Sequence, residues 1–313
     1  MRILISGASG YLGSRICKEL KKKHHIIAIT RNPDKFNYFN EKIADEIITL
    51  KSFDNNFLEK VVDSKPEIFI HLISLDSSAS NSNPSNSFDI NVGNTFKLLN
   101  HLKDSKTLKK FIYFSTIHVY NSSLKKIDEL TKPNPNNFYS LTHFLSEEIS
   151  NYFNKEANFK CINLRLSNSY GEPVFENENC WKLVVNELVK SANEKKIISL
   201  NGEGLTSRDF IHYSDICDAI SKLIITDNSK FNHNTYNLSS GNSLLLIELA
   251  ELINKEFEGK IKILINSNES YLPSPKNLVS KITYSNERIK SLIKFNPIAV
   301  SEGIFKMIKE LKN

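Results

Sequence analysis

The chain has 313 residues, of which 40% are hydrophobic and 24% charged, which is ordinary for a globular protein of one or two domains. No apolar run approaches the roughly 20 residues of a membrane span, and the N-terminus already has the pattern of a strand, so neither membrane insertion nor a signal peptide is expected. The net charge of +6 is modest, and its densest cluster, residues 21–25, follows a predicted helix whose dipole suits cations, so nucleic-acid binding is not expected.

The N-terminal residues MRILISGASGYLG carry the strongest local signal. Residues 2–6 are typical of a strand buried in a parallel sheet, and Leu12, Ile16 and Leu20 recur at helical spacing. Strand, glycine turn and helix aim backbone N–H groups at a pyrophosphate, so this segment predicts a nucleotide-cofactor site. The predicted cofactor contacts are Gly7, Ser9, Gly10, Tyr11, Leu12 and Gly13.

Strand-like and helical stretches alternate through the first half of the chain. Strands are expected at 26–30, 46–50, 68–73, 111–115 and 161–167, and helices at 57–63, 88–104 and 139–154. This alternation predicts an α/β fold with a doubly wound parallel sheet. The polar stretch 74–87 is expected to be a flexible loop over the cofactor.

After residue 167 the pattern loosens into loops with helices expected at 181–194, 215–225 and 245–257. We therefore predict a dinucleotide-binding domain over 1–167. Residues 168–313 are expected to form mainly a smaller α/β substrate-binding region, with some segments packing back on the first domain.

The four cysteines do not form a recognisable site. Cys17, Cys161, Cys180 and Cys217 are scattered without CxxC spacing. They predict reduced thiols in a cytoplasmic protein and no metal site.

The ordered motifs resemble one family along nearly the whole chain. They are GASGYLG, IFIHLIS, NVGNTFKLLN, FIYFSTIHVYN, YSLTH, LRLSNSYGEP and GEGLTSRDFIHYSDICDAI. The chain resembles the extended short-chain dehydrogenases/reductases, specifically the NAD(P)-dependent nucleotide-sugar epimerase/dehydratase group. That resemblance implies a Rossmann-type sheet and further cofactor contacts at His71, Leu72, Ile73 and Asn91.

The resemblance also implies a catalytic set at Thr116, Tyr139 and the position four residues after the tyrosine. In the family that position is a lysine whose charge activates the tyrosine and which binds the ribose; here it is His143. Three interpretations stay open: His143 fills space in a decayed site, it orients the ribose, or its imidazolium replaces the ammonium. Tyr139 and His143 are thus expected to contact the cofactor as well.

Residues after Thr116 bear on the reaction type. In the family's 4,6-dehydratases an acidic pair follows the threonine, whereas Ile117 and His118 stand here. The resemblance therefore argues against 4,6-dehydratase chemistry. His118 is either an additional acid/base group or a substrate contact.

Cofactor choice depends on the residues after the second strand. The sequence there is Ile29-Thr30-Arg31-Asn32-Pro33, with no acidic residue to accept from the ribose hydroxyls of NAD before Asp34. Arg31 suits the additional phosphate of NADP, so NADP(H) is favoured, with NAD(H) as the alternative.

On the substrate side, the resemblance assigns Asn168 and Arg208 to the diphosphate. Trp181, the only tryptophan, is either a stacking surface for the nucleobase or a core residue.

Together these features predict an NAD(P)-dependent oxidoreductase acting on a keto or hydroxyl carbon of a nucleotide-activated sugar, in surface polysaccharide synthesis. The alternatives are an epimerase that retains its NAD(P), or a non-catalytic nucleotide-binding relative. The resemblance also implies a homodimer formed through 88–104 and 139–154.

Overall fold

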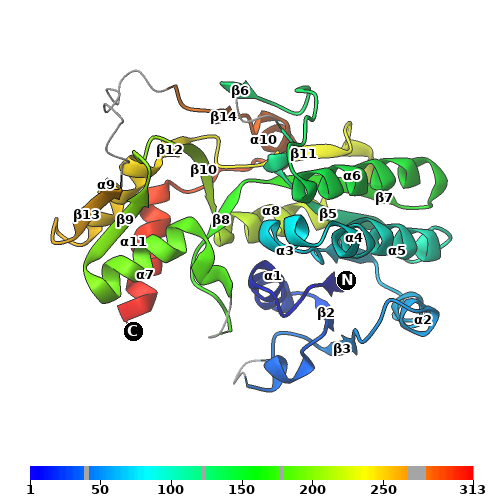
Figure 1. The fold of residues 1–313 in the computed structure, drawn as a ribbon. Coiled ribbons are helices and arrows are strands. Elements are labelled where there is room, and N and C mark those ends of the chain that lie inside the picture. The colour runs from blue at the N-terminus through cyan, green and yellow to red at the C-terminus, as the bar shows by residue number, and fades with distance from the viewer. Residues whose placement is uncertain (39–41, 121–123, 176–178, 267–279, 313) are drawn as a thin grey trace.

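The computed structural model describes residues 1–38, 42–120, 124–175, 179–266 and 280–312. At its centre lies a seven-stranded parallel sheet in the order β11-β7-β5-β4-β1-β2-β3 (Figure 1). Its strands are β1 (Arg2–Ser6), β2 (His25–Thr30), β3 (Glu46–Thr49), β4 (Ile68–His71), β5 (Lys110–Thr116), β7 (Lys160–Leu166) and β11 (Thr235–Leu238). The predicted doubly wound sheet is confirmed, and its order reverses between β1 and β4, where sheets of this type bind ligands.

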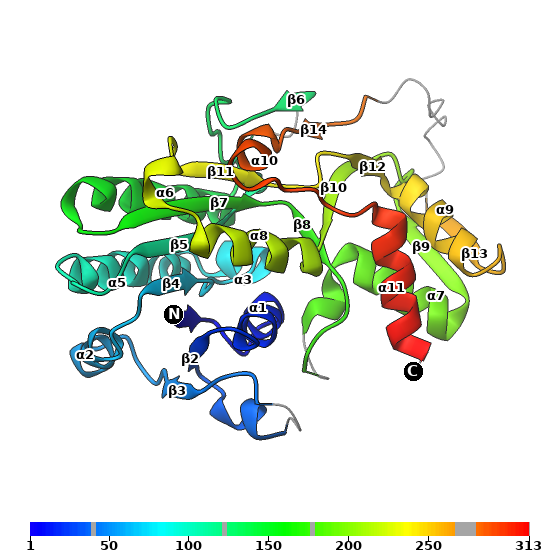
Figure 2. The same ribbon diagram turned by 180° about the vertical axis from the view of Figure 1, so that it is seen from behind.

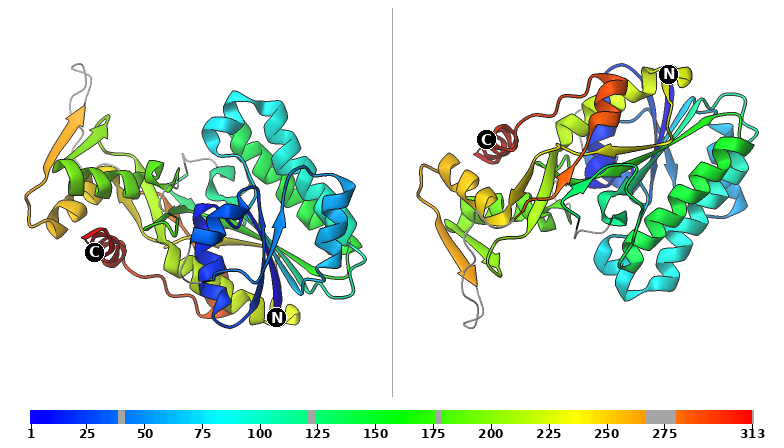
Figure 3. Two further views of the ribbon diagram at one scale, coloured as in Figure 1. Left: turned by 90° about the horizontal axis from the view of Figure 1, so that it is seen from below. Right: turned by 90° about the horizontal axis from the view of Figure 1, so that it is seen from above.

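Helices cover both faces of this sheet (Figure 3). One face packs against α1 (Tyr11–Lys21), α8 (Tyr213–Ile225) and α10 (Glu287–Ile293), and the other against α2 (Asn55–Asp63), α5 (Asn94–Leu102) and α6 (Phe138–Glu156). Ile3 and Ile5 enter the first core and Leu4 the second. A strand buried on both faces has to be apolar throughout, which explains the N-terminal run.

The polar stretch 74–87 is not the flexible loop expected from its composition. It contains α3 (Ser77–Ser82) and α4 (Pro84–Ser87). The Asp76 carboxylate accepts from the Ala79 N–H at 2.9 Å, the Asn83 side chain accepts from the Asn86 N–H, and Pro84 occupies the first turn of α4. Polar residues here act as helix caps. The low hydrophobic content of residues 74–87 therefore led to the wrong prediction of a loop.

The second half of the chain forms a smaller α/β unit beside the sheet (Figure 2). Five strands make two small sheets: β8 (Asn168–Tyr170), β10 (Ser207–His212) and β12 (Ser243–Leu245) in one, β9 (Ile197–Asn201) and β13 (Lys262–Asn266) in the other. Helices α7 (Val184–Lys195), α9 (Leu246–Glu256) and α11 (Val300–Lys312) pack around a separate hydrophobic core. These strands were not foreseen, because each is short and several are half-exposed.

Other segments of the second half pack on the central sheet. Strand β11 pairs with β7, and α8 contributes Ile216, Ile220 and Leu223 to the core beside α1. A further parallel pair joins β6 (Lys126–Ile127) to β14 (Thr283–Tyr284). The chain therefore crosses between the two units several times, and a boundary at residue 167 stays a prediction.

Candidate active site

The glycine turn between β1 and α1 is closely packed. Gly7 has φ +68°, which favours glycine, and a Cβ there would lie 3.3 Å from the Leu72 carbonyl carbon. A Cβ on Gly13 would overlap the Gly7 carbonyl oxygen. Gly10 caps α1 through its backbone alone, without a side-chain hydrogen bond. The turn thus leaves the first N–H groups of α1 uncovered by any capping side chain, at the carboxyl edge of the sheet.

Ser9 connects this turn to the end of β2. The Thr30 hydroxyl donates to Ser9 Oγ at 2.7 Å and accepts from the Asn32 N–H at 2.9 Å. Arg31 follows directly and has an exposed side chain. Ser9 therefore holds Thr30, the residue that directly precedes Arg31, through a hydrogen bond.

The end of β4 is held by a buried polar chain. Ser6 Oγ lies 2.7 Å from His71 Nδ1 and accepts from the Leu72 N–H at 3.1 Å, while His71 Nε2 lies 3.2 Å from Thr95 Oγ1. Both ring nitrogens of His71 thus have protein partners and its side chain is fully enclosed, so burial lowers its pKa to about 3. A cofactor contact at this position would have to come from the backbone; Ile73, two residues on, packs against the core beside α2 and α5.

Both polar atoms of the Asn91 side-chain amide also have hydrogen-bond partners in the protein. Its Oδ1 accepts from the Leu75 N–H at 2.8 Å, and its Nδ2 donates to Ser87 and Thr142. The residue lies in the π-helical turn η2 (Phe88–Gly93), ahead of α5. It ties the segment after β4 to α6, the helix that carries Tyr139.

Thr116, Tyr139 and His143 come together at the carboxyl end of β5. Thr116 ends β5, and Tyr139 lies in the first turn of α6. The ring centroids of Tyr139 and His143 are 4.6 Å apart. Burial raises the pKa of the Tyr139 hydroxyl, and a hydrogen bond with Thr116 opposes that rise. The three residues predicted from the motifs thus form one cluster, in which Thr116 and His143 are buried and Tyr139 is half-buried.

His143 is neutral at pH 7. Burial, followed by the neighbouring His118, lowers its pKa to about 3. Its Nδ1 lies 2.9 Å from the Tyr113 hydroxyl, whereas its buried Nε2 has no hydrogen-bond partner within the described part of the chain. A neutral ring disfavours the interpretation in which an imidazolium replaces the lysine ammonium.

A buried ion pair below the cluster was not foreseen. Glu147 and Arg165 form a bidentate pair, with Nη2 2.6 Å from Oε2 and Nε 3.0 Å from Oε1. The Ser115 hydroxyl also donates to Glu147, and Arg165 Nη1 donates to the Tyr120 hydroxyl at 2.8 Å. The pair joins α6 to β7 and, through Ser115, to the end of β5 next to Thr116.

The predicted substrate residues lie on the second unit or face it. Asn168 begins β8 and donates to the Asp209 carbonyl at 2.8 Å, and Arg208 lies on the adjacent β10. Partial desolvation and the charge of Arg208 lower the pKa of His118, so these two side chains are electrostatic neighbours. Trp181 lies in the short turn η4 (Asn179–Lys182) and packs against the second core, with Lys190 Nζ 5.2 Å from its ring centroid.

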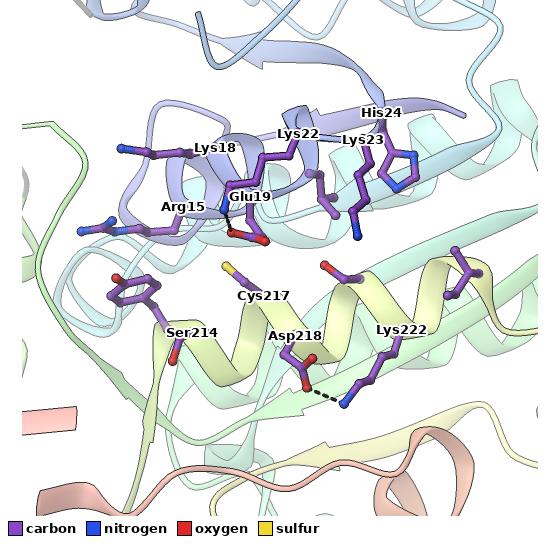
Figure 4. A pocket seen from close by; sticks show the side chains of 14 residues that line it. Arg15, Lys18, Glu19, Lys22, Lys23, His24, Ser214, Cys217, Asp218 and Lys222 are labelled. Atoms are coloured by element: carbon purple, nitrogen blue, oxygen red, sulfur yellow. Dashed lines mark hydrogen bonds and ion pairs between the residues drawn. The ribbon is translucent and has the colours of Figure 1, made fainter. Parts of the chain in front are cut away.

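A charged groove between α1 and α8 is separate from this cluster (Figure 4). Its cations are largely paired within the protein: Lys22 with Glu19 at 2.6 Å and Lys222 with Asp218 at 2.7 Å. Arg15 donates to the Glu172 carbonyl, at 2.6 Å from Nη2. These pairs lie within one helix or reach Glu172, so none of them joins α1 to α8, and they leave few free charges in the groove.

Two classes of site are absent from the residues that the structure describes. No group of three or more His, Cys, Asp or Glu side chains among them is arranged to hold a metal ion. In the same ranges no helix is long and apolar enough to cross a membrane.

Comparison with known proteins agrees with this geometry. The chain is 28% identical over 294 residues to UDP-glucose 4-epimerase of Mycoplasma genitalium, spanning 87% of this chain and 86% of that relative. It is 28% identical over 258 residues to GDP-6-deoxy-D-talose 4-dehydrogenase of Aggregatibacter actinomycetemcomitans, spanning 81% and 79%.

Solved structures share the fold. UDP-glucuronic acid 4-epimerase from Bacillus cereus, solved with UDP-glucuronic acid and NAD, matches with a TM-score of 0.80 at 21% identity, covering 99% of this chain and 100% of that one. The profile of the NAD dependent epimerase/dehydratase family matches residues 3–239. With the glycine turn, the Thr116–Tyr139 pair and the sheet order in place, this chain belongs to the NAD-dependent epimerase/dehydratase family.

Proposed function

We propose that this protein moves a hydride between a nicotinamide dinucleotide and carbon 4 of a nucleoside diphosphate sugar. The observation that carries the proposal is the cluster of Thr116, Tyr139 and His143 at the edge of the sheet that also holds the glycine turn. The relatives named above act, by their names, as 4-epimerases and a 4-dehydrogenase. Oxidation or reduction at carbon 4 is the chemistry those names have in common.

The residues present fit such a cofactor. A Cβ at Gly13 or Gly7 would intrude on the turn, the N-terminus of α1 has no capping side chain, and the buried His143 Nε2 has no partner among the described residues. The glycine turn would hold the pyrophosphate and His143 the nicotinamide ribose. When bound, the nicotinamide supplies the site of hydride exchange.

Tyr139 is the proton-transfer group in this proposal. Because burial raises the pKa of its hydroxyl, the phenol keeps its proton at neutral pH. It is therefore prepared to donate that proton to a sugar keto oxygen held by Thr116, the reductive direction. In the oxidative direction the phenolate oxygen of Tyr139 would take the proton from the sugar hydroxyl.

The protonated state of Tyr139 favours the reductive direction of the proposed reaction. A neutral His143 supplies no positive charge to lower the pKa of Tyr139, unlike the lysine that the family pattern places there. The absence of carboxylates at Ile117 and His118 argues against sugar dehydration. We therefore favour the reductive direction, in surface polysaccharide synthesis.

An epimerase with retained cofactor is the second candidate, supported by the match to UDP-glucose 4-epimerase over most of both chains. The two differ in stoichiometry. A reductase consumes one NAD(P)H for each sugar reduced, whereas an epimerase interconverts two sugars with no net change in cofactor.

We also propose that NADP(H) is preferred, through Arg31. The side chain is exposed at the carboxyl end of β2, and Asp34 lies within the following turn η1 (Pro33–Tyr38) instead of directly after the strand. A guanidinium there suits a ribose phosphate better than a free hydroxyl.

A homodimer through α5 and α6 completes the proposal. These helices expose large apolar side chains, with Phe96 48% and Tyr152 58% accessible. Phe88, just ahead of α5, is 45% accessible. Contiguous exposed apolar side chains on paired helices are typical of an interface between subunits.

The test is a panel of UDP-, GDP-, CDP- and dTDP-sugars, 4-keto sugars included, assayed with NADH and NADPH for cofactor oxidation and for sugar products. Tyr139→Phe should lower turnover about 100-fold or more, since it removes the transferred proton. Tyr236→Phe on β11, which removes a hydroxyl that donates to the His233 carbonyl, is the matched control. Turnover unchanged in Tyr139→Phe, or no turnover with any sugar, would leave the non-catalytic nucleotide-binding alternative.

A further inference from the structure

Tyr113 is a buried tyrosine in contact with the site whose role nothing above assigns. It lies on β5, three residues before Thr116, and is 1% exposed. Its hydroxyl is 2.9 Å from Nδ1 of His143, and the two rings are tilted by 34° with centroids 6.0 Å apart. The hydroxyl is thus directed at one nitrogen of the residue that replaces the family's lysine.

A neutral imidazole has one N–H and one lone pair, and the partner of one nitrogen decides the role of the other. His143 is neutral, so only two arrangements exist. If Tyr113 donates to Nδ1, the proton lies on Nε2, and that atom is a donor. If Nδ1–H donates to Tyr113, Nε2 is a bare acceptor.

The Tyr113 hydroxyl keeps its proton, because burial raises its pKa far above neutrality. The nearby Ser146 hydroxyl is placed to donate to backbone carbonyls, 2.9 Å from the oxygens of Asn91 and Thr142. Ser146 therefore supplies no proton to Tyr113, and the proton of Tyr113 goes either to His143 Nδ1 or to Ser146 Oγ. The choice between these two acceptors sets the tautomer of His143.

We propose that Tyr113 is a positioning residue that donates to Nδ1 of His143 and so holds the imidazole as the Nε2–H tautomer. The buried Nε2, unpartnered among the described residues, then presents an N–H to the cofactor ribose, in place of an ammonium that can only donate. This inference rests on the proposed function, since it assigns the donor that the cofactor would meet. Tyr113 acts through His143 and touches no reacting atom.

The tautomer is measured directly by nitrogen-15 NMR of histidine-labelled full-length protein, with and without bound cofactor. The His143 resonances are identified by their loss in His143→Asn. We expect Nε2 to be protonated and Nδ1 unprotonated in the wild-type protein near pH 7. In Tyr113→Phe, which keeps the ring and removes only the hydroxyl, the Nδ1–H form should become populated. A wild-type protein with its proton on Nδ1 overturns the proposal.

Cofactor affinity gives a second readout that does not depend on turnover. Tyr113→Phe should weaken NAD(P)(H) binding about 2- to 10-fold, the range for one neutral hydrogen bond. The control Tyr236→Phe should bind the cofactor as the wild type does, which separates the effect from general loss of a tyrosine hydroxyl.

A double-mutant cycle separates positioning from packing. In a His143→Lys background there is no ring nitrogen to orient, so adding Tyr113→Phe should leave cofactor affinity unchanged. Equal weakening in both backgrounds would mean that Tyr113 acts only through packing, and the proposal would be wrong. Failure of the proposed reaction, by contrast, would appear as absent turnover with the NMR tautomer and the cofactor affinities unaffected.

Discussion

The protonation state of His143 distinguishes between the roles open to it. Its pKa of about 3 means that raising the pH from about 6 to about 8 removes no proton from the ring. We therefore expect no loss of kcat/KM with rising pH near 6.5, where an unperturbed histidine titrates. A pH-rate profile of wild type and His143→Lys checks this. A limb near 6.5 that vanishes in His143→Lys would restore the imidazolium interpretation.

Arg31 gives a separate prediction about the cofactor. Arg31→Ala should weaken NADPH by about 1.5–3 kcal/mol, the value of a hydrogen bond to a charged group, and change NADH little. Calorimetry or fluorescence titration with both cofactors measures the difference. Lys51→Ala removes an exposed cation just past the neighbouring strand β3 and should affect neither. Tighter binding of NADH than NADPH by the unaltered protein would refute the preference.

At the scale of single residues, the sequence motifs identified the candidate residues of the site but not the contacts that these residues make. Thr116, Tyr139 and His143 were predicted from the resemblance to the family, and the structure brings them close together, while their catalytic roles stay a prediction. The Glu147–Arg165 pair was missed, although an arginine in the apolar strand after residue 160 was a signal. Its partner is 18 residues away on a helix, and only tertiary packing brings the two charges together.

At the scale of elements, helix α1 packs closely against the glycine turn that precedes it. Gly13→Ala places a methyl group on the Gly7 carbonyl oxygen, so we expect a loss of at least about 2 kcal/mol in the free energy of unfolding. Chemical denaturation measures it. Gly93→Ala, whose Cβ would make an ordinary contact of 3.8 Å with the Phe88 carbonyl oxygen, serves as the control. A Gly13→Ala protein as stable as Gly93→Ala would contradict this account of the turn.

The elements that the sequence predicted well are those whose own residues show a clear hydrophobic pattern. Strands β1, β2, β4, β5 and β7 lie within a few residues of their expected positions, because each is mostly apolar and buried on both faces. The helices of 74–87 were missed because Asp76, Asn83 and Pro84 stabilise them through capping, which hydrophobicity does not report. The short strands after residue 167 gain their order from neighbours distant in sequence.

For the whole molecule, the proposed dimer predicts a change in mass. Phe96→Glu with Tyr152→Glu places charge on the exposed faces of α5 and α6, so light scattering should show a dimer for the wild type and a monomer for the double variant. Phe305→Glu, at a 56% exposed position on α11, should stay dimeric. A wild-type monomer at micromolar concentration would contradict the proposal.

The central sheet is completed from late in the chain, and this matters during synthesis. Strand β11 pairs with β7 about 70 residues after β7 has been made, and α8 covers apolar side chains of β1 and α1 from about 190 residues or more further along the chain. A nascent chain that has emerged only as far as residue 167 has an open β7 edge and one sheet face that only α1 covers. Such an intermediate is prone to associate with other chains. The first half therefore depends on the second for its solubility during translation, so expressing it alone should yield aggregate.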